Sequence, residues 1–289
     1  MPHPNHTPGY NQPLHTTRSI AELRSLKAPR PLGLVPTMGA LHAGHAQLIE
    51  EARRASATVA LSIFVNPIQF NQSEDFERYP RPLEADLAFC KARAVDLVFA
   101  PPPEEMYPEP PAAFVEVTRL TDHMEGRFRP GHFRGVATVV LKLFQIVQPD
   151  RAWFGQKDAQ QLAVIRRMVR DLNLPVEITG VPTVREPDGL ALSSRNQHLG
   201  PHERRIAPRL YQALRAAAEC IAAGERSAGA ARRPALDLLA AEPPLRVEYL
   251  EIADAEMQPV IHISGPVTIA AAVWLGRTRL IDNIYCEVL

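Results

Sequence analysis

The stretch that decides the fold is GLVPTMGALHAGHAQLI, residues 33–49, in which a short apolar run leads into a glycine-containing turn and then into an amphipathic segment. A short apolar run bounded by turn residues is typical of a buried strand, and the spacing of apolar residues that follows is typical of a helix. A strand that runs directly into a helix is the repeating unit of a parallel sheet. The segment therefore predicts the first unit of a doubly wound domain.

Apolar runs and amphipathic segments keep alternating as far as about residue 181. Runs such as LSIFV are apolar throughout, which is typical of strands that are buried on both faces of a parallel sheet. We therefore expect an α/β fold, a Rossmann-like doubly wound parallel sheet, over residues 1–183. The expected strands are residues 32–37, 58–65, 95–100, 151–155 and 176–181, and the expected helices are residues 44–57, 83–94, 135–147 and 158–172.

The chain changes in character after this point. A turn-rich stretch is followed by an alanine-rich helix expected from Glu203 to Ala223 and a second from Ala230 to Ala241. Three short β-like segments broken by turns then fit a small antiparallel sheet. We expect residues 184–289 to form a smaller α+β domain that closes over the first as a lid. The three segments are residues 246–254, 267–276 and 278–289.

The first 17 residues contain four prolines and three histidines but no apolar run. They are expected to form a flexible arm and not a secretory signal. Histidines scattered in such an arm are usually incidental, so no function is assigned to His3, His6 and His15.

The composition is that of an ordinary globular protein, with 46% hydrophobic and 22% charged residues. Lysine plus arginine equals aspartate plus glutamate at 32 each, so no nucleic-acid partner is expected. Three widely spaced cysteines, Cys90, Cys220 and Cys286, suit reduced, buried thiols in the cytoplasm. No apolar run is long enough to span a membrane, so no membrane association is expected.

Two histidines stand where the expected helix begins. His42 and His45 are three residues apart, so they share a face at the end of the helix where free N–H groups and the helix dipole favour anions. Gly44 lies between them, and its lack of a Cβ lets a nucleotide approach the backbone. The pair is therefore suited to a triphosphate. A zinc site is the alternative, although no cysteine or third histidine is near in the sequence.

A second candidate phosphate-binding segment is ALSSRNQHL, residues 191–199, which follows the last expected strand of the parallel sheet. The hydroxyls of Ser193 and Ser194 and the guanidinium of Arg195 are suited to grip phosphate oxygens and to follow charge onto departing pyrophosphate. Serine pairs on protein surfaces are common, so this segment gains its meaning only together with the histidines.

Residues 33–49 resemble the HIGH signature of the nucleotidyltransferase superfamily, and residues 191–199 resemble its KMSKS-type loop. Three further strings make the resemblance more specific: SIFVNPIQF at 62–70, RPGHFRGVATVV at 129–140 and FGQKDAQQLAVIRRMV at 154–169. Together they are similar to the pantothenate synthetase family. Gln156 departs from the family's string, which usually has glutamate there.

The resemblance implies an ATP-dependent ligase that condenses pantoate with β-alanine through pantoyl adenylate, with Mg²⁺ on the phosphates, as a cytoplasmic homodimer. It implies catalytic roles for His42, His45, Lys157, Ser193, Ser194 and Arg195, with His45 donating a proton to a leaving phosphate oxygen. It places ATP on Met38, Gly39, Ala40, Leu41, His42, Ala43, Gly44, His45, Gly155, Gln156, Lys157, Asp158, Val184, Leu192, Ser193, Ser194 and Arg195.

The resemblance also implies that Gln69 and Gln161 hold pantoate and that Gln69 touches β-alanine. The residues themselves allow this, because Asn66 and Gln69 follow a buried strand and their amides would project at its carboxyl end. The alternative is that both glutamines are merely solvated. Glu125, Arg129 and Tyr79 lie in matching stretches, either at the site or ordering loops over it.

Two other functions share part of this pattern. A nucleotidyltransferase that leaves the nucleotide on its product would have the histidines and the basic loop but should lack the paired glutamines. A non-catalytic or RNA-binding relative of the synthetases would need a basic surface or an anticodon-binding domain. The presence of the paired glutamines argues against the first. The balanced charge and the short C-terminal part leave little room for a basic surface or an anticodon-binding domain.

Overall fold

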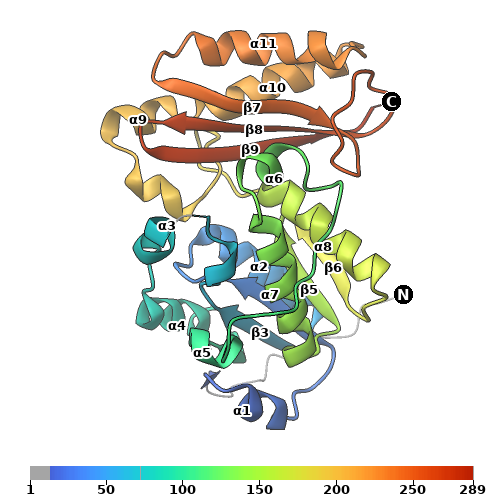
Figure 1. Cartoon of the computed structure of the whole chain (residues 1–289). Helices are drawn as coiled ribbons and strands as arrows, with labels where there is room; N and C mark the ends of the chain where they lie inside the picture. Colours follow the sequence, from blue (N-terminus) through green and yellow to red (C-terminus); the bar gives the residue numbers. More distant parts are fainter. Residues whose placement is uncertain (1–13, 72, 289) are drawn as a thin grey trace, which may run out of the picture.

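A six-stranded, entirely parallel sheet lies in the N-terminal part of the chain (Figure 1). The computed structural model describes residues 14–71 and 73–288. The strands follow the order β1-β4-β3-β2-β5-β6, and this sheet confirms the predicted Rossmann-like class. They are β1 (His15–Thr17), β2 (Leu32–Thr37), β3 (Thr58–Ile63), β4 (Leu97–Phe99), β5 (Arg151–Gly155) and β6 (Glu177–Val181).

Helices join these strands and continue through the C-terminal part. They are α1 (Ile20–Ser25), α2 (Ala43–Ala55), α3 (Ser73–Arg78), α4 (Leu83–Lys91), α5 (Pro103–Met106), α6 (Met124–Phe128), α7 (His132–Val147), α8 (Ala159–Asp171), α9 (Pro201–Ile206), α10 (Arg209–Ala222) and α11 (Ala228–Ala240). Short 3₁₀ helices are η1 (Pro67–Gln69), η2 (Gln156–Asp158) and η3 (Ser194–His198). No helix in the described part is long and apolar enough to cross a membrane.

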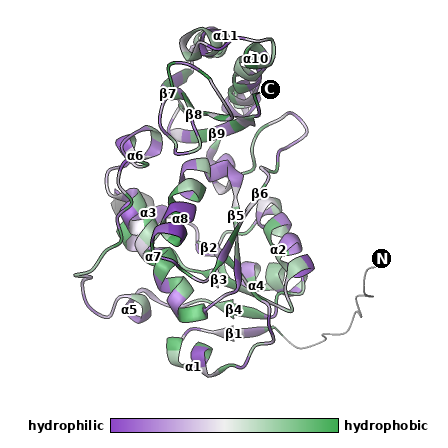
Figure 2. Cartoon of the chain, turned by 90° about the vertical axis from the view of Figure 1, so that its right-hand side faces the viewer, coloured by the Kyte–Doolittle hydropathy of each residue, from purple (hydrophilic) through white to green (hydrophobic). Residues whose placement is uncertain are grey.

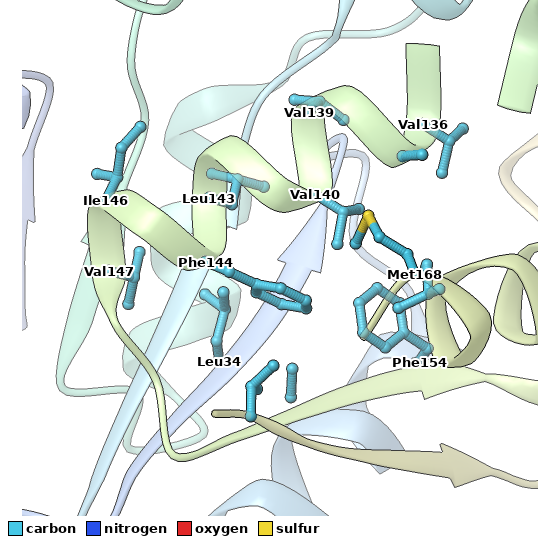
Figure 3. Packing of buried hydrophobic residues seen from close by; sticks show 14 of the residues in the cluster. Leu34, Val136, Val139, Val140, Leu143, Phe144, Ile146, Val147, Phe154 and Met168 are labelled. Atoms are coloured by element: carbon cyan, nitrogen blue, oxygen red, sulfur yellow. The ribbon is translucent and has the colours of Figure 1, made fainter. Parts of the chain in front are cut away.

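Both faces of the parallel sheet are covered. Leu34 packs in one cluster with residues of α7 and α8, whereas its neighbour Val35 packs in another with residues of α2 and α4. This follows from the strand geometry, in which successive side chains point to opposite faces. Figure 2 shows α7 and α8 on one side of the strands and α2 on the other. Figure 3 shows Val140 and Phe144 of α7 directed toward Leu34, Phe154 and Met168.

The strand order reverses at the centre of the sheet. β2 pairs with β3 on one side and with β5 on the other, so the crossover helices leave in opposite directions. In such sheets the crevice outside the carboxyl ends of the strands at this switch point is where ligands bind. The predicted site segments follow Thr37 and Gly155, the last residues of β2 and β5.

A three-stranded antiparallel sheet forms the C-terminal part, with β7 (Leu245–Ala253), β8 (Val267–Leu275) and β9 (Thr278–Cys286) in that order. One face packs on α10 and α11 in a separate core. The other face meets the N-terminal part near α6 (Figure 1). There Tyr249 and Ala270 pack against Met124 of α6. The smaller α+β unit is confirmed.

Some predictions need correction. His15–Thr17, expected in a flexible arm, form β1 and pair with β4, while His3 and His6 lie outside the described residues. The single helix expected over 203–223 is divided into α9 and α10, with Pro208 at the break, because proline lacks the N–H that a continuous helix needs. Of the cysteines, Cys90 is buried, but Cys220 and Cys286 are only partly so.

Candidate active site

A pocket lies outside the carboxyl ends of β2, β5 and β6. Its volume is about 250 Å³, and a larger cavity of about 600 Å³ adjoins it between the two parts of the chain. Both cavities are lined by Tyr79, Arg129, Lys157, Asp158 and the Ser193–Arg195 segment. The predicted site residues that line the smaller pocket are Met38, His42, Gly44, His45, Gln69, Gly155, Lys157, Asp158, Gln161, Val184, Leu192, Ser193, Ser194 and Arg195.

Five residues predicted at the ATP site do not line this pocket: Gly39, Ala40, Leu41, Ala43 and Gln156. The backbone N–H groups of Ala40 and Leu41 instead donate to the carboxylate of Asp86, at 2.9 and 2.8 Å. Asp86 is 3% exposed, so this carboxylate is fully engaged in holding the turn between β2 and α2. The side chain of Gln156 is exposed.

The two histidines cap α2. Nδ1 of His42 accepts from the backbone N–H of Gly44 (3.1 Å), and Nδ1 of His45 accepts from the backbone N–H of His42 (3.2 Å). The ring centroids are 4.2 Å apart. Because both Nδ1 atoms are acceptors, each neutral ring carries its proton on Nε2. The pair therefore offers two N–H donors to the pocket that both rings line.

Both imidazoles are held neutral. Burial lowers the pKa of His45 to about 3, with further lowering by His42 and Lys157. Burial and Lys157 also lower the pKa of His42. Near pH 7 the free protein therefore holds His45 as a hydrogen-bond donor and not as an acid. The pKa of His45 thus does not stay near neutrality in the free protein, and the proton transfer expected of His45 stays a prediction.

The His42 ring leaves no room for a side chain at residue 44. A Cβ at residue 44 would lie 2.9 Å from Cε1 and 3.1 Å from Nδ1 of His42. Gly44→Ala is expected to displace the imidazole and raise the KM for ATP about tenfold, as one aligned donor is lost. Steady-state kinetics would measure this. Gly265→Ala, where a Cβ meets no atom within 4 Å, is the control, and equal KM values for both variants would contradict the explanation.

Asn66 acts differently from what the sequence suggested. It is 1% exposed, and its amide nitrogen donates to Oε1 of Gln69 (3.0 Å) and to the carbonyl of Gly135 (3.1 Å). The hydroxyl of Tyr107 donates to Oδ1 of Asn66 (3.0 Å). The side chain of Asn66 therefore orients Gln69 and does not face the pocket. Because Oε1 of Gln69 is an acceptor here, its NH₂ group is the end directed toward Met38, where Nε2 and Sδ are 3.0 Å apart.

The neighbouring glutamines of α8 have separate tasks. Gln161 lines the pocket, as predicted. Gln160 is 4% exposed and accepts from the N–H of Glu125 while donating to the carbonyls of Leu120 and His123. Gln160 therefore orders the loop that precedes α6, which makes it a supporting residue and not a ligand-facing one.

A histidine that the sequence analysis did not single out supports Arg129. His132 is 7% exposed, and its Nδ1–H donates to the carbonyl of Gln69 (2.9 Å). Its Nε2 is then the acceptor for Nη1 of Arg129, at 3.0 Å. Burial, with a contribution from Arg129, lowers the pKa of His132 to about 4. A neutral His132 thus holds the guanidinium that lines both cavities.

The serine–arginine loop meets Tyr79. Ser193 caps η3 by accepting from the N–H of Arg195 (3.2 Å). Burial raises the pKa of Tyr79, while Arg195 and a hydrogen bond with Ser194 act in the opposite direction. Tyr79 therefore lies against this loop and lines both cavities with it.

The neutral histidines make stability depend on pH. His45 and His132 have pKa values of about 3 and about 4 in the folded protein, below the value of about 6.5 for an unfolded chain. Protons therefore bind the unfolded chain first as the pH falls below 6.5. Lowering the pH from 7 to 5 is expected to cost about 1 to 2 kcal/mol for each imidazole. Urea unfolding at both pH values would measure this, and His132→Asn should show a shallower dependence. An unchanged dependence would contradict the assignment.

Known proteins match this chain along almost its whole length. The family model described as pantoate-beta-alanine ligase matches residues 12–285. The chain is 56% identical over 258 residues to the pantothenate synthetase of Moorella thermoacetica, covering 89% of this chain and 91% of that protein. No group of three or more histidine, cysteine or acidic residues suited to a metal ion occurs in the described part of the chain.

Two solved structures are similar over almost the whole chain. The pantothenate synthetase of Thermus thermophilus has 51% identity and a TM-score of 0.90, covering 94% of this chain and 99% of that one. The pantoate-beta-alanine ligase of Francisella tularensis, complexed with beta-gamma ATP and beta-alanine, has 33% identity and a TM-score of 0.77, covering 94% and 97%. The motifs, the two sheets and these relatives together show that the chain belongs to the pantoate–β-alanine ligase family.

Proposed function

We propose that this ligase, which condenses pantoate with β-alanine at the expense of ATP, works in two steps through pantoyl adenylate. In the first step the pantoate carboxylate attacks the α-phosphorus of ATP, and pyrophosphate leaves. In the second step the amine of β-alanine attacks the activated acyl carbon, the amide bond forms and AMP leaves. The observation that carries this proposal is one pocket lined by both candidate phosphate-binding segments and both glutamines.

The first step brings two anions together, so alignment and charge stabilisation dominate its catalysis. Lys157 and Arg195 supply positive charge, and the serines supply hydroxyl donors. The neutral rings of His42 and His45 add N–H donors for phosphate oxygens. Binding of an anionic triphosphate would raise the pKa of both rings, because a neighbouring negative charge favours the protonated form.

Gln69 and Gln161 are proposed to hold pantoate, with Gln69 also touching β-alanine. The Tyr107–Asn66–Gln69 hydrogen bonds support this, because they leave the NH₂ group of Gln69 as a donor of fixed orientation. A fixed donor suits a polyol acid, whose hydroxyls and carboxylate all accept hydrogen bonds. A merely solvated side chain at residue 69 would not need such buried hydrogen bonds.

The smaller pocket offers one carboxylate that could hold magnesium. Among the described residues that line the smaller pocket, Asp158 is the acidic one, and its side chain is 46% exposed. This suits Mg²⁺, which is usually held by one or two carboxylates, by water and by substrate phosphates. Asp158 would hold the ion, which would neutralise charge on the phosphates.

The C-terminal unit, from residue 184, is proposed to act as a lid that keeps water from the acyl adenylate. Support comes from the larger cavity, whose walls include Trp274 and Arg277 of the C-terminal part together with Arg78 of the N-terminal part. A cytoplasmic homodimer is the further proposal that the family resemblance supports.

The test is pyrophosphate release from ATP and Mg²⁺ with pantoate, with and without β-alanine. Release that needs pantoate, with AMP and pantothenate formed only when β-alanine is present, is the expected result. Release elicited by a nucleotide monophosphate or another acid, and not by pantoate, would contradict the substrate assignment. Transfer of the nucleotide onto a final product would favour the nucleotidyltransferase alternative.

A further inference from the structure

Strand β9 of the C-terminal sheet reaches the segment that carries Lys157. The side-chain amide of Asn283 donates to two successive carbonyls, those of Gln156 (2.9 Å) and Lys157 (2.8 Å). These carbonyls belong to η2, a three-residue 3₁₀ helix whose N-cap makes no side-chain hydrogen bond. The conformation of η2 therefore depends on a residue far away in the sequence.

The preceding residue of β9 pairs with Arg185, which lies ahead of the serine–arginine loop in the chain. Asp282 is 4% exposed, and its carboxylate pairs with both terminal nitrogens of Arg185, at 2.5 and 2.9 Å. Arg185 also donates to the backbone carbonyls of Asn283 (3.2 Å) and Gly189 (3.1 Å). A doubly hydrogen-bonded, buried pair of this kind has a fixed geometry.

Arg185 lies at the base of the hairpin that leads into this loop. It forms a β-bridge with Ala191, and the N–H of Leu192 donates to the carbonyl of Val184 (2.9 Å). Ser193 follows directly. The position of Arg185 therefore sets where the loop of Ser193, Ser194 and Arg195 leaves the hairpin.

We propose that Asp282 and Asn283 form a brace that holds the Lys157 segment and the serine–arginine loop at a fixed separation. Asn283 fixes the Lys157 segment, Asp282 fixes the serine–arginine loop through Arg185, and the two residues are adjacent on one strand. Both are positioning residues, because they act through the groups that meet the triphosphate. The proposal rests on the proposed function, which assigns ATP to these segments.

The brace has a physical consequence for binding. A triphosphate that must touch Lys157 and the serine–arginine loop together binds best when their separation is set beforehand, since ordering them at the moment of binding costs affinity. Loss of the Asn283 amide frees η2 to move away from the loop. The effect should therefore appear in ATP affinity and not only in stability.

The test is titration calorimetry of the full-length protein with ATP and Mg²⁺, together with the KM for ATP. Asn283→Ala is expected to raise the Kd for ATP about tenfold through the loss of two hydrogen bonds. Asn283→Asp, which sets a carboxylate against the same two carbonyls at nearly equal volume, should raise it at least as much. In the double variant Asn283→Ala/Lys157→Ala, the Asn283→Ala substitution should add little to the effect of Lys157→Ala alone on the Kd for ATP.

Gln258→Ala is the matched control. Its amide also crosses to the N-terminal part, donating to the carbonyl of Arg119 (3.0 Å), and it donates locally to the carbonyl of Glu256 (3.3 Å). Gln258 does not line the two active-site cavities. It should lower the melting temperature and leave the Kd for ATP unchanged. Wild-type affinity in both Asn283 variants, with weak binding in Lys157→Ala, would overturn the brace alone. Wild-type affinity in Lys157→Ala would overturn the ATP assignment as well.

Discussion

His45→Ala is expected to lower the rate of pyrophosphate release about 10² to 10³-fold, the usual effect of removing one aligned donor from a developing charge. His45 is held in place by the backbone N–H of His42, and its ring lines the pocket with that of His42. Alanine keeps the helix but removes the Nε2–H donor. Single-turnover measurement of pyrophosphate release with saturating ATP and pantoate would give this rate.

His45→Gln separates two roles for the ring. The pKa of about 3 makes His45 a neutral donor in the free protein, and a glutamine amide is also a neutral donor. Glutamine should therefore restore at least part of the activity that alanine loses. If His45 instead transfers a proton to a phosphate oxygen, glutamine would be as slow as alanine, because an amide does not titrate in this range.

Much of the fold could be predicted because its signals are local. The strand of residues 151–155 was predicted with the bounds that β5 has, and the helix of 158–172 is α8 to within one residue at each end. Apolar runs and helical periodicity are properties of neighbouring residues, so a sequence displays them directly. The strand β1 could not be predicted in this way, because its three residues are too few to show an apolar run or a periodic pattern.

The supporting residues of the site could not be predicted in the same way. Asp86 is separated by 46 residues in the sequence from Ala40, whose backbone N–H donates to its carboxylate. Tyr107 is separated by 41 residues from its hydrogen-bond partner Asn66. Such pairings exist only once the chain has folded, and a lone aspartate or tyrosine in the sequence has no feature that reveals them. The residues that line the pocket could be predicted because they follow strand ends and form strings shared with a family.

Arg279→Met is expected to cost about 3 to 5 kcal/mol of unfolding free energy, the usual effect of breaking a buried ion pair. Arg279 of β9 makes two hydrogen bonds to Glu125 of α6, at 2.8 and 2.6 Å, and others to Glu248 of β7. All three side chains are no more than 15% exposed. Methionine fills the space but leaves two carboxylates without the cation between them. Urea unfolding at pH 7.5 would measure the loss.

Arg233→Met is the matched control, because Arg233 pairs with Asp237 at 3.2 Å on the surface, where the side chains are 77% and 66% exposed. Its cost should stay below about 1 kcal/mol. A similar cost for both variants would mean that burial adds nothing to the Arg279 pair. The control also has the same change of side chain, so differences in volume and charge cancel.

The cost of Arg279→Met should also depend on pH in a defined direction. Burial raises the pKa of Glu125, but the hydrogen bonds and charge of Arg279 outweigh it and leave the pKa below its usual value. In the wild type this carboxylate stabilises the fold above its unfolded pKa, and the benefit is lost as the pH falls through the folded value. Without Arg279, burial raises the pKa of Glu125 in the folded protein instead. The ionised Glu125 then destabilises the fold at neutral pH, and protonation at lower pH removes this cost. The difference in unfolding free energy between the wild type and Arg279→Met should therefore become smaller from pH 7.5 to pH 4.5. A difference that stays constant would show that the variant loses stability through lost packing and not through an unpaired buried carboxylate.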